Sequence, residues 1–207
     1  MGKGKLLVLV LLNIGFLNAQ KVIKKSIFNP NTSSILIDTG NCFKLDLSTT
    51  ISKEIVVEAI IDGEYKNDLL LRIEEQQSTT KISTGFHPSF INPNDKLSAH
   101  KVVSIALKVQ IPEHMKVRII GTSCNANIKG TYDILKVSLD DGICNLENVS
   151  KSVHVVTQSG DIHVRTNKGD IVSKSTFGNV FKANIPRGNS NFDLSTITGN
   201  IYLKKTE

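Results

Sequence analysis

Residues 135–164 read LKVSLDDGICNLENVSKSVHVVTQSGDIHV, and this stretch decides the fold. Apolar and polar residues alternate on both sides of a corner at Gly142, and the same pattern returns around a second corner at Gly160. Alternation with a period of two is typical of β-strands, whose successive side chains point to opposite faces. The stretch therefore predicts pairs of short strands that meet at a glycine corner and repeat at the spacing from Gly142 to Gly160.

The corner recurs along the C-terminal half of the chain. Cys124, Gly142, Gly160 and Gly178 follow one another at a constant 18-residue spacing, and a fifth copy at Gly199 comes after a slightly longer interval. The next position holds an amide or a carboxylate in most copies, namely Asn125, Asp161, Asn179 and Asn200. We interpret both positions as turn chemistry, in which glycine supplies a positive φ and the Asn or Asp side chain caps its own turn. A calcium or sugar-binding ladder is the alternative, but calcium prefers several convergent carboxylates and carbonyls.

Strand pairs that repeat at a short fixed period cannot bury their apolar rows alone, so they stack copy on copy. We therefore predict a β-solenoid, a β-helix-like stack over residues 112–207 in which each residue lies near its equivalent in the next copy. An antiparallel sandwich of hairpins would show similar alternation, but it would not require the constant spacing. We expect the fifth copy, from Phe192 to Leu203, to form the last coil and to leave its C-terminal edge open to a partner or to self-association.

The N-terminal half shows the same alternation without the 18-residue spacing. Residues 55–61, 69–73 and 103–111 are examples, and helical periodicity is weak throughout. We predict an all-β fold with antiparallel strands or degenerate coils over residues 35–111, closing one end of the stack. Residues 20–207 would then form a single domain.

Residues 1–19 have the organisation of a secretory signal peptide. Two lysines precede an apolar run at 6–12, and the segment ends in the small residue Ala19. The apolar stretch is shorter than a membrane-spanning helix needs. We expect export to the periplasm or cell surface, with cleavage after Ala19 and no membrane span. An exported protein can form disulfides, but we expect Cys42, Cys124 and Cys144 to be buried free thiols, because buried cysteine behaves as a small hydrophobe.

The amino-acid composition excludes several classes of protein. The 207 residues are 40% hydrophobic, which excludes a disordered chain, and 25 Lys and Arg against 19 Asp and Glu give a net charge of +6. With no Trp and three Tyr, the chain lacks the aromatic platform of a nucleic-acid-binding protein. It carries no phosphate loop, nucleophile elbow or zinc signature, so we expect no catalytic residue, metal or cofactor.

One surface is a candidate for ligand binding. If the copies stack, the outward positions three and five places after each corner align on one sheet face. Aromatic rings there can stack on sugars and cations can attract acidic saccharides. The candidate residues are His163, Arg165, Phe181, Tyr202 and Lys204. The alternatives are an ordinary solvated sheet, or a polysaccharide-active enzyme, which would need a base and converging charges that His163 and Arg165 do not supply alone.

Three segments resemble one known family. The strand that ends at Val109–Pro112, followed by Ser159–Ile162 and Thr198–Ile201, is similar to the putative adhesin family of bacterial exported proteins. The resemblance implies a β-helix-like stack and a non-enzymatic binding or scaffold role in the cell envelope, with a surface polysaccharide or envelope protein as partner. It supplies no catalytic residues. The chain departs from the family pattern at Cys124 and Ile143. The other functions considered are a lyase or hydrolase and an envelope sensor or accessory protein.

Overall fold

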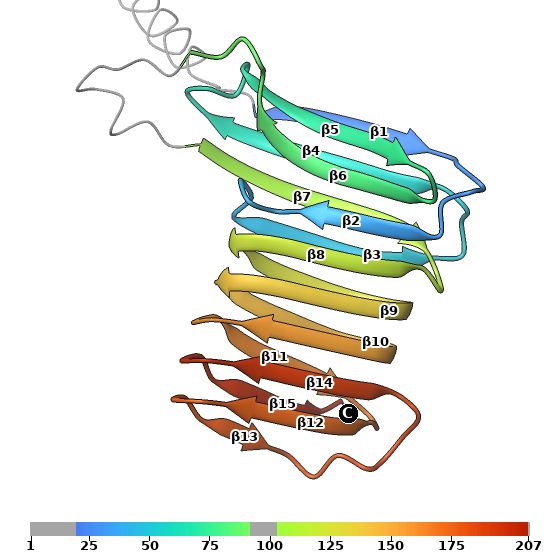
Figure 1. Ribbon diagram of the computed structural model, residues 1–207, viewed down its shortest axis with the longest axis vertical. Coiled ribbons are helices and arrows are strands. Elements are labelled where there is room, and N and C mark those ends of the chain that lie inside the picture. Colours follow the sequence, from blue (N-terminus) through green and yellow to red (C-terminus); the bar gives the residue numbers. More distant parts are fainter. Residues whose placement is uncertain (1–19, 92–102, 207) are drawn as a thin grey trace, which may run out of the picture.

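The computed structural model describes residues 20–91 and 103–206, and in these two ranges all the regular elements are β-strands (Figure 1). The predicted all-β class is confirmed. The signal peptide predicted at 1–19 lies outside the described residues. Within the described part of the chain, no helix is long and apolar enough to cross a membrane.

The strands up to residue 112 are β1 Lys21–Ile27, β2 Ser34–Asp38, β3 Lys44–Thr50, β4 Ile55–Gly63, β5 Leu69–Gln76, β6 Thr79–Phe86 and β7 Val103–Pro112. Those that follow are β8 Lys116–Ser123, β9 Asn125–Asp141, β10 Ile143–Thr157, β11 Asp161–Thr166, β12 Asp170–Ser175, β13 Val180–Lys182, β14 Asn191–Thr196 and β15 Ile201–Lys205.

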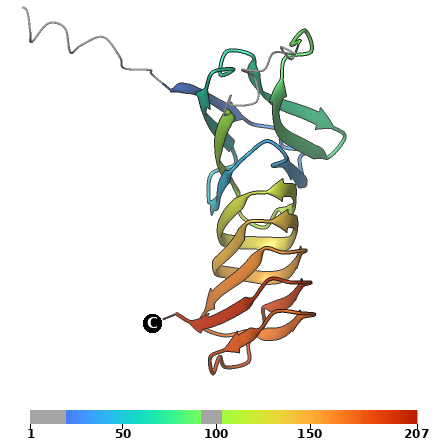
Figure 2. The same cartoon turned by 90° about the vertical axis from the view of Figure 1, so that its left-hand side faces the viewer.

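The paired strands form an open sheet that is folded into two layers around one core (Figures 1 and 2). Layer 1 runs β1-β4-β7-β3, continues through the first parts of β9 and β10, and ends with β11, β15 and β13. Layer 2 runs β5-β6-β2-β8, continues through the second parts of β9 and β10, and ends with β14 and β12. Because β9 and β10 are long, each passes from one layer to the other.

The N-terminal part combines both pairing directions. β1, β4 and β7 pair antiparallel in layer 1, and β5 pairs antiparallel with β6 in layer 2. β3 and β2 pair in parallel with their neighbours and join this part to the repeats. The antiparallel strands therefore lie at one end of the stack.

The first three copies stack as their spacing predicts. β9, β10 and β11 are parallel, and their register aligns Ala126 with Cys144 and Cys144 with Ile162, so that each residue lies beside its equivalent in the next copy. The same offset joins Leu135 to Val153 in layer 2. The three cysteines are free and buried, as expected.

The fifth copy does not form the end of the stack. β14 pairs with β10 on one side and with β12 on the other, and β15 lies between β11 and β13 in the same way. The expectation that residues 192–203 form an open last coil is therefore wrong. The fifth copy is inserted between the third and the fourth, and β12 and β13 of the fourth copy form the end (Figure 1).

The inward residues explain this order. In the fifth copy, Phe192 and Leu194 are 2% and 1% exposed. The corresponding residues of the fourth copy are Ile171 and Ser173, which are only partly buried. Burying the more apolar copy between two neighbours removes the larger apolar surface from water, and the more polar copy is left to end the stack.

The positive φ predicted for the glycine corners is confirmed at Gly142 and wrong at the three later corners. Among the described glycines, Gly142 has a positive φ of 96°, whereas Gly160, Gly178 and Gly199 do not lie in that region. A Cβ on Gly160 would lie 2.6 Å from the carbonyl oxygen of Gly142, and one on Gly199 would lie 2.3 Å from that of Gly160. A Cβ on Gly178 would lie 2.1 Å from the carbonyl oxygen of Gly199. Close approach of stacked corners, and not a positive φ, thus requires glycine in the last three copies.

The Asn and Asp side chains at the corners cap the neighbouring copy and not their own turn. The Oδ1 atom of Asp161 accepts a hydrogen bond from the backbone N–H of Asn200 at 2.7 Å. The Oδ1 atom of Asn200 in turn accepts one from the N–H of Asn179 at 3.0 Å. In the first copy, Asn125 accepts from the N–H of Ile143 at 3.0 Å. The column therefore links successive copies.

Candidate functional site

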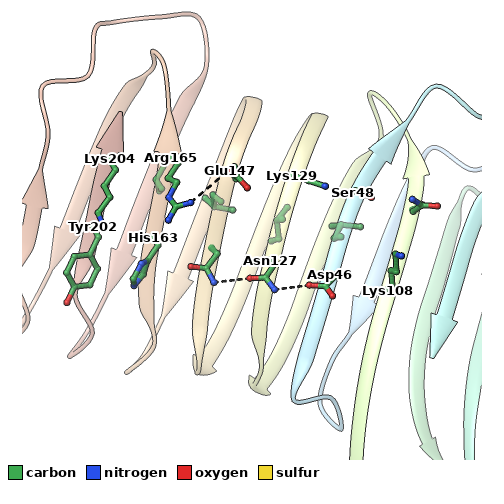
Figure 3. Close-up of a pocket in the computed structure, with 16 residues that line it drawn as sticks. Asp46, Ser48, Lys108, Asn127, Lys129, Glu147, His163, Arg165, Tyr202 and Lys204 are labelled. Atoms are coloured by element: carbon green, nitrogen blue, oxygen red, sulfur yellow. Dashed lines mark hydrogen bonds and ion pairs between the residues drawn. The ribbon is translucent and has the colours of Figure 1, made fainter. Parts of the chain in front are cut away.

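A groove of about 670 Å³ lies on the outer surface of layer 1 (Figure 3). Strand alternation points every second side chain outward, and the parallel register aligns these side chains in rows across the strands. The first row comprises the residues three places after a corner, Asn127, Asn145, His163 and Tyr202, and is extended in register by Asp46 on β3 and Lys108 on β7. The second row comprises the residues five places after a corner, Lys129, Glu147, Arg165 and Lys204, and is extended in register by Ser48 on β3 and Gln110 on β7.

The structure brings four of the five predicted ligand-face residues together in this groove, namely His163, Arg165, Tyr202 and Lys204. Phe181 lies beside Tyr202 on the end strand β13 and does not line the groove. The sequence reasoning missed the residues that β3 and β7 contribute, such as Asp46 and Lys108. These two strands lie outside the 18-residue repeat, so nothing in the spacing predicted their register.

Hydrogen bonds fix the floor of the groove on the side of β3. The Nδ2 atom of Asn145 donates to Oδ1 of Asn127 at 2.9 Å, and the Nδ2 atom of Asn127 donates to Oδ1 of Asp46 at 2.8 Å (Figure 3). Lys44 contacts the other oxygen of Asp46 at 3.0 Å. Partial burial works against ionisation of Asp46, but the bonds from Asn127 and Lys44 outweigh it and hold the pKa of this carboxyl below its ordinary value. Asp46 is therefore ionised at neutral pH.

The aromatic residues pack on one another across the strands. The rings of Phe181 and Tyr202 are stacked, with centroids 4.9 Å apart and planes within 10°. On its other side Tyr202 contacts His163, with ring centroids 4.6 Å apart and planes tilted by 43°. Because Tyr202 has a neighbouring ring on each side, its faces are largely covered. A ligand in the groove would therefore meet ring edges, the phenol hydroxyl and the imidazole nitrogens.

Four cations line the groove against two carboxylates. Arg165 is directly opposite Lys204 on the neighbouring strand, and like charges in this position repel each other. Glu147 offsets the repulsion weakly, because its Oε1 atom is 3.9 Å from Arg165 and both side chains are exposed. Partial burial, with the positive charges of Lys204 and Arg165, lowers the pKa of His163, although Asp161 opposes the shift. The imidazole is therefore neutral at pH 7.

The groove can attract an anion and can hydrogen-bond to hydroxyl groups. Both of its carboxylates already have partners. Asp46 accepts a hydrogen bond from Asn127 and pairs with Lys44, and Glu147 lies near Arg165. Among the residues that the structure describes, no group of three or more His, Cys, Asp or Glu side chains is arranged to hold a metal ion.

Comparison with family models and with curated proteins finds no match. Among solved structures, a putative cell adhesion protein from Clostridium sporogenes shares 14% identity and a TM-score of 0.63, over 91% of this chain and 100% of that one. A putative adhesin from Bacteroides fragilis shares 11% identity and a TM-score of 0.41, over 91% and 98%. At 14% identity, the likeness to the C. sporogenes protein shows a shared fold alone. The chain thus has the all-β fold of a solved bacterial protein described as a putative cell adhesion protein.

Proposed function

We propose that this chain is an exported, non-enzymatic adhesin-like protein of the cell envelope, whose groove binds an extended acidic polymer such as a surface polysaccharide. In this proposal the fold is a β-solenoid with 18-residue coils, as the offset between the first three copies suggests. The signal peptide that the sequence predicts at residues 1–19 and the fold shared with the C. sporogenes protein support an envelope role.

The observation that carries the proposal is the excess of positive charge in the groove, where four cations lie against two carboxylates. Arg165 lies opposite Lys204, an arrangement that lowers the stability of a sheet. Such a pair alone does not mark a site, because Arg118 and Lys136 are also opposite each other in layer 2. In the groove, Lys108 and Lys129 add to the positive charge of the pair, so a bound anion would reduce the repulsion among several cations at once.

The dimensions of the groove suit a linear polymer. Neighbouring strands are about 4.8 Å apart, so a chain that lies across them meets a new side chain at each step of about that length. Lys129, Arg165 and Lys204 would face its acidic groups, while Asn127 and Asn145 in the adjacent row would hydrogen-bond to its hydroxyls. Adhesion by such repeated weak contacts depends on length, because each contact raises the effective concentration of the next.

The proposal is tested with polygalacturonate and with its methyl ester as probes, because the two differ mainly in charge. Affinity electrophoresis of residues 20–207 should show retention by polygalacturonate that falls steeply when salt is raised from about 0.05 to 0.5 M, and little retention by the ester. The variant R165A/K204A should lose most of this retention. The control variant R118A/K136A removes a pair of exposed cations that are likewise opposite each other, but in layer 2, and it should retain the wild-type behaviour.

The same experiment distinguishes the alternative functions when the length of the polymer is followed. Shortening of the polysaccharide would favour the enzyme, with His163 and Arg165 as the first residues to test. Equal retention of both probes, or equal loss in the two double variants, would exclude the groove as an acidic-polymer site. Absence of retention on all acidic probes would favour an envelope protein as the partner.

A further inference from the structure

The end strand of layer 2 has unused backbone hydrogen-bonding groups. Within the described residues β12 pairs with β14 alone. The N–H of Asp170 donates to Ser190 and that of Thr176 donates to Thr196, so the even-numbered residues of β12 face β14. In a parallel ladder the intervening residues point the opposite way. The N–H and C=O groups of Ile171, Ser173 and Ser175 therefore point to the free edge of the sheet.

The apolar interior is only partly covered at this end, where Ile185 of the segment after β13 packs against the core. Ile171 and Ser173 are only partly buried, whereas Phe192 and Leu194, beside them on β14, are buried. The buried Oγ atom of Ser173 has no hydrogen-bond partner among the described residues. The end of layer 2 thus offers both polar backbone groups and some apolar surface to an additional strand.

The outward side chains of β12 are complementary to themselves. Asp170, Val172 and Lys174 form an exposed row, and Val172 is 66% exposed. If a second β12 runs antiparallel with Val172 opposite Val172, each Asp170 faces Lys174 of the second copy. This alignment also places Ile171 opposite Ser173, and these are residues whose backbone groups point to the edge. The orientation of the backbone groups of β12 and the charges of its outward side chains therefore favour the same register.

We propose that two copies of this protein associate through their β12 strands, antiparallel and centred on Val172. Ile171 and Ser173 would form hydrogen-bonded pairs across the two-fold axis, each exchanging two hydrogen bonds. Asp170 and Lys174 would form non-hydrogen-bonded pairs, in which side chains approach most closely. A charged edge normally prevents pairing with arbitrary strands, and this pattern permits one partner of matching charge, a second copy.

The pairing has a consequence for the groove. The two-fold axis is perpendicular to layer 2 at the seam, so the half-turn that relates the two copies leaves layer 1 of both on the same side. The two grooves would then open in the same direction at opposite ends of one longer stack. The inference itself does not depend on what the groove binds, because it rests on β12 alone.

Charge exchange tests the register. Sedimentation equilibrium of residues 20–207 should show a concentration-dependent dimer. D170K and K174D should each raise its dissociation constant by about tenfold or more, because both symmetric pairs become repulsive. D170K/K174D should restore it, and an equimolar mixture of the two single variants should form heterodimers. K53D, at an exposed bend between β3 and β4, serves as the control. An effect of K53D equal to that of K174D, or no recovery in the double variant, would refute the proposed pairing.

Cross-linking tests the same contact when the association is weak. V172C should form disulfide-linked dimers with oxidised glutathione at least about tenfold faster than V156C, because Val156 lies on β10 inside the same layer. The three native cysteines are buried and should not interfere. Equal rates for the two variants, together with a monomer at all concentrations, would overturn the proposal. Circular dichroism confirms in each case that the variant is folded.

Discussion

Leu194 provides a direct test of the inserted fifth copy. Its side chain is 1% exposed and lies between Val155 on β10 and Ser173 on β12. Truncation to alanine in a site enclosed on both sides costs about 3 kcal/mol, from lost transfer energy and from the cavity left behind. If the copies stacked in chain order, Leu194 would lie in the last coil, half covered as Ile171 is here. L194A would then cost only about 1 kcal/mol.

The assay is urea unfolding of residues 20–207, with I171A as the matched variant from the end strand. We expect L194A to exceed I171A by about 2 kcal/mol, which is a difference of about 1 M in the urea midpoint for a slope near 2 kcal/mol per M. Hydrogen exchange adds a second measurement, because the amides of β14 should be more protected than those of β12. Equal costs for the two variants, or greater protection of β12, would refute the insertion.

Three further outcomes are expected. G199A should lower the free energy of unfolding in urea by about 2–3 kcal/mol, because its Cβ would lie 2.3 Å from a stacked carbonyl oxygen. G85A is the control and should cost under about 0.5 kcal/mol, because the nearest atom to its Cβ would be 4.0 Å away. Burial raises the pKa of Cys42 and Cys144 to about 12 and that of Cys124 to about 11. The contribution of these thiols to stability should therefore be constant below pH 9, their ordinary pKa, and should fall as the pH rises toward 12. An unchanged urea midpoint at pH 10.5 would contradict this. The pKa of His163 is lower in the folded protein than its ordinary value of 6.5. The stabilisation that the neutral imidazole contributes is therefore complete above pH 6.5 and is lost as the pH falls through the pKa of the folded state. A bound polyanion would raise that pKa, so polygalacturonate should be retained more strongly below pH 6.5, and H163Q should remove this dependence.

The local pairing of the repeats could be predicted from the sequence, because the strand period and the 18-residue spacing are both local features. They place Cys144 beside Ala126 and Ile162, as the structure does. The order of the last two copies could not be read from spacing, since a parallel stack accepts either order. The relevant signal was composition: Ser173 and Ser175 suit an end strand, and Phe192 and Leu194 do not.

The groove could be predicted only in part for a similar reason. His163 and Arg165 follow from the repeat, because their positions relative to the corner define an outward row. Asp46 and Lys108 come from strands whose register is set by tertiary pairing between β7, β3 and β9. The predicted positive φ was wrong for Gly160, Gly178 and Gly199, because the approach of two corners is a property of the stack and not of a single turn.

The insertion of the fifth copy also determines the composition of the groove. In chain-order stacking, the regular offset between copies would place Phe181 beside His163 and Ala183 beside Arg165. The observed order places Tyr202 and Lys204 there instead, which gives the ring contact with His163 and the like-charge pair with Arg165. The same event moves β12 to the end of layer 2, where its charged row is free to face a second copy. One rearrangement, favoured by the burial of Phe192 and Leu194, thus creates both the cationic groove and the self-complementary edge.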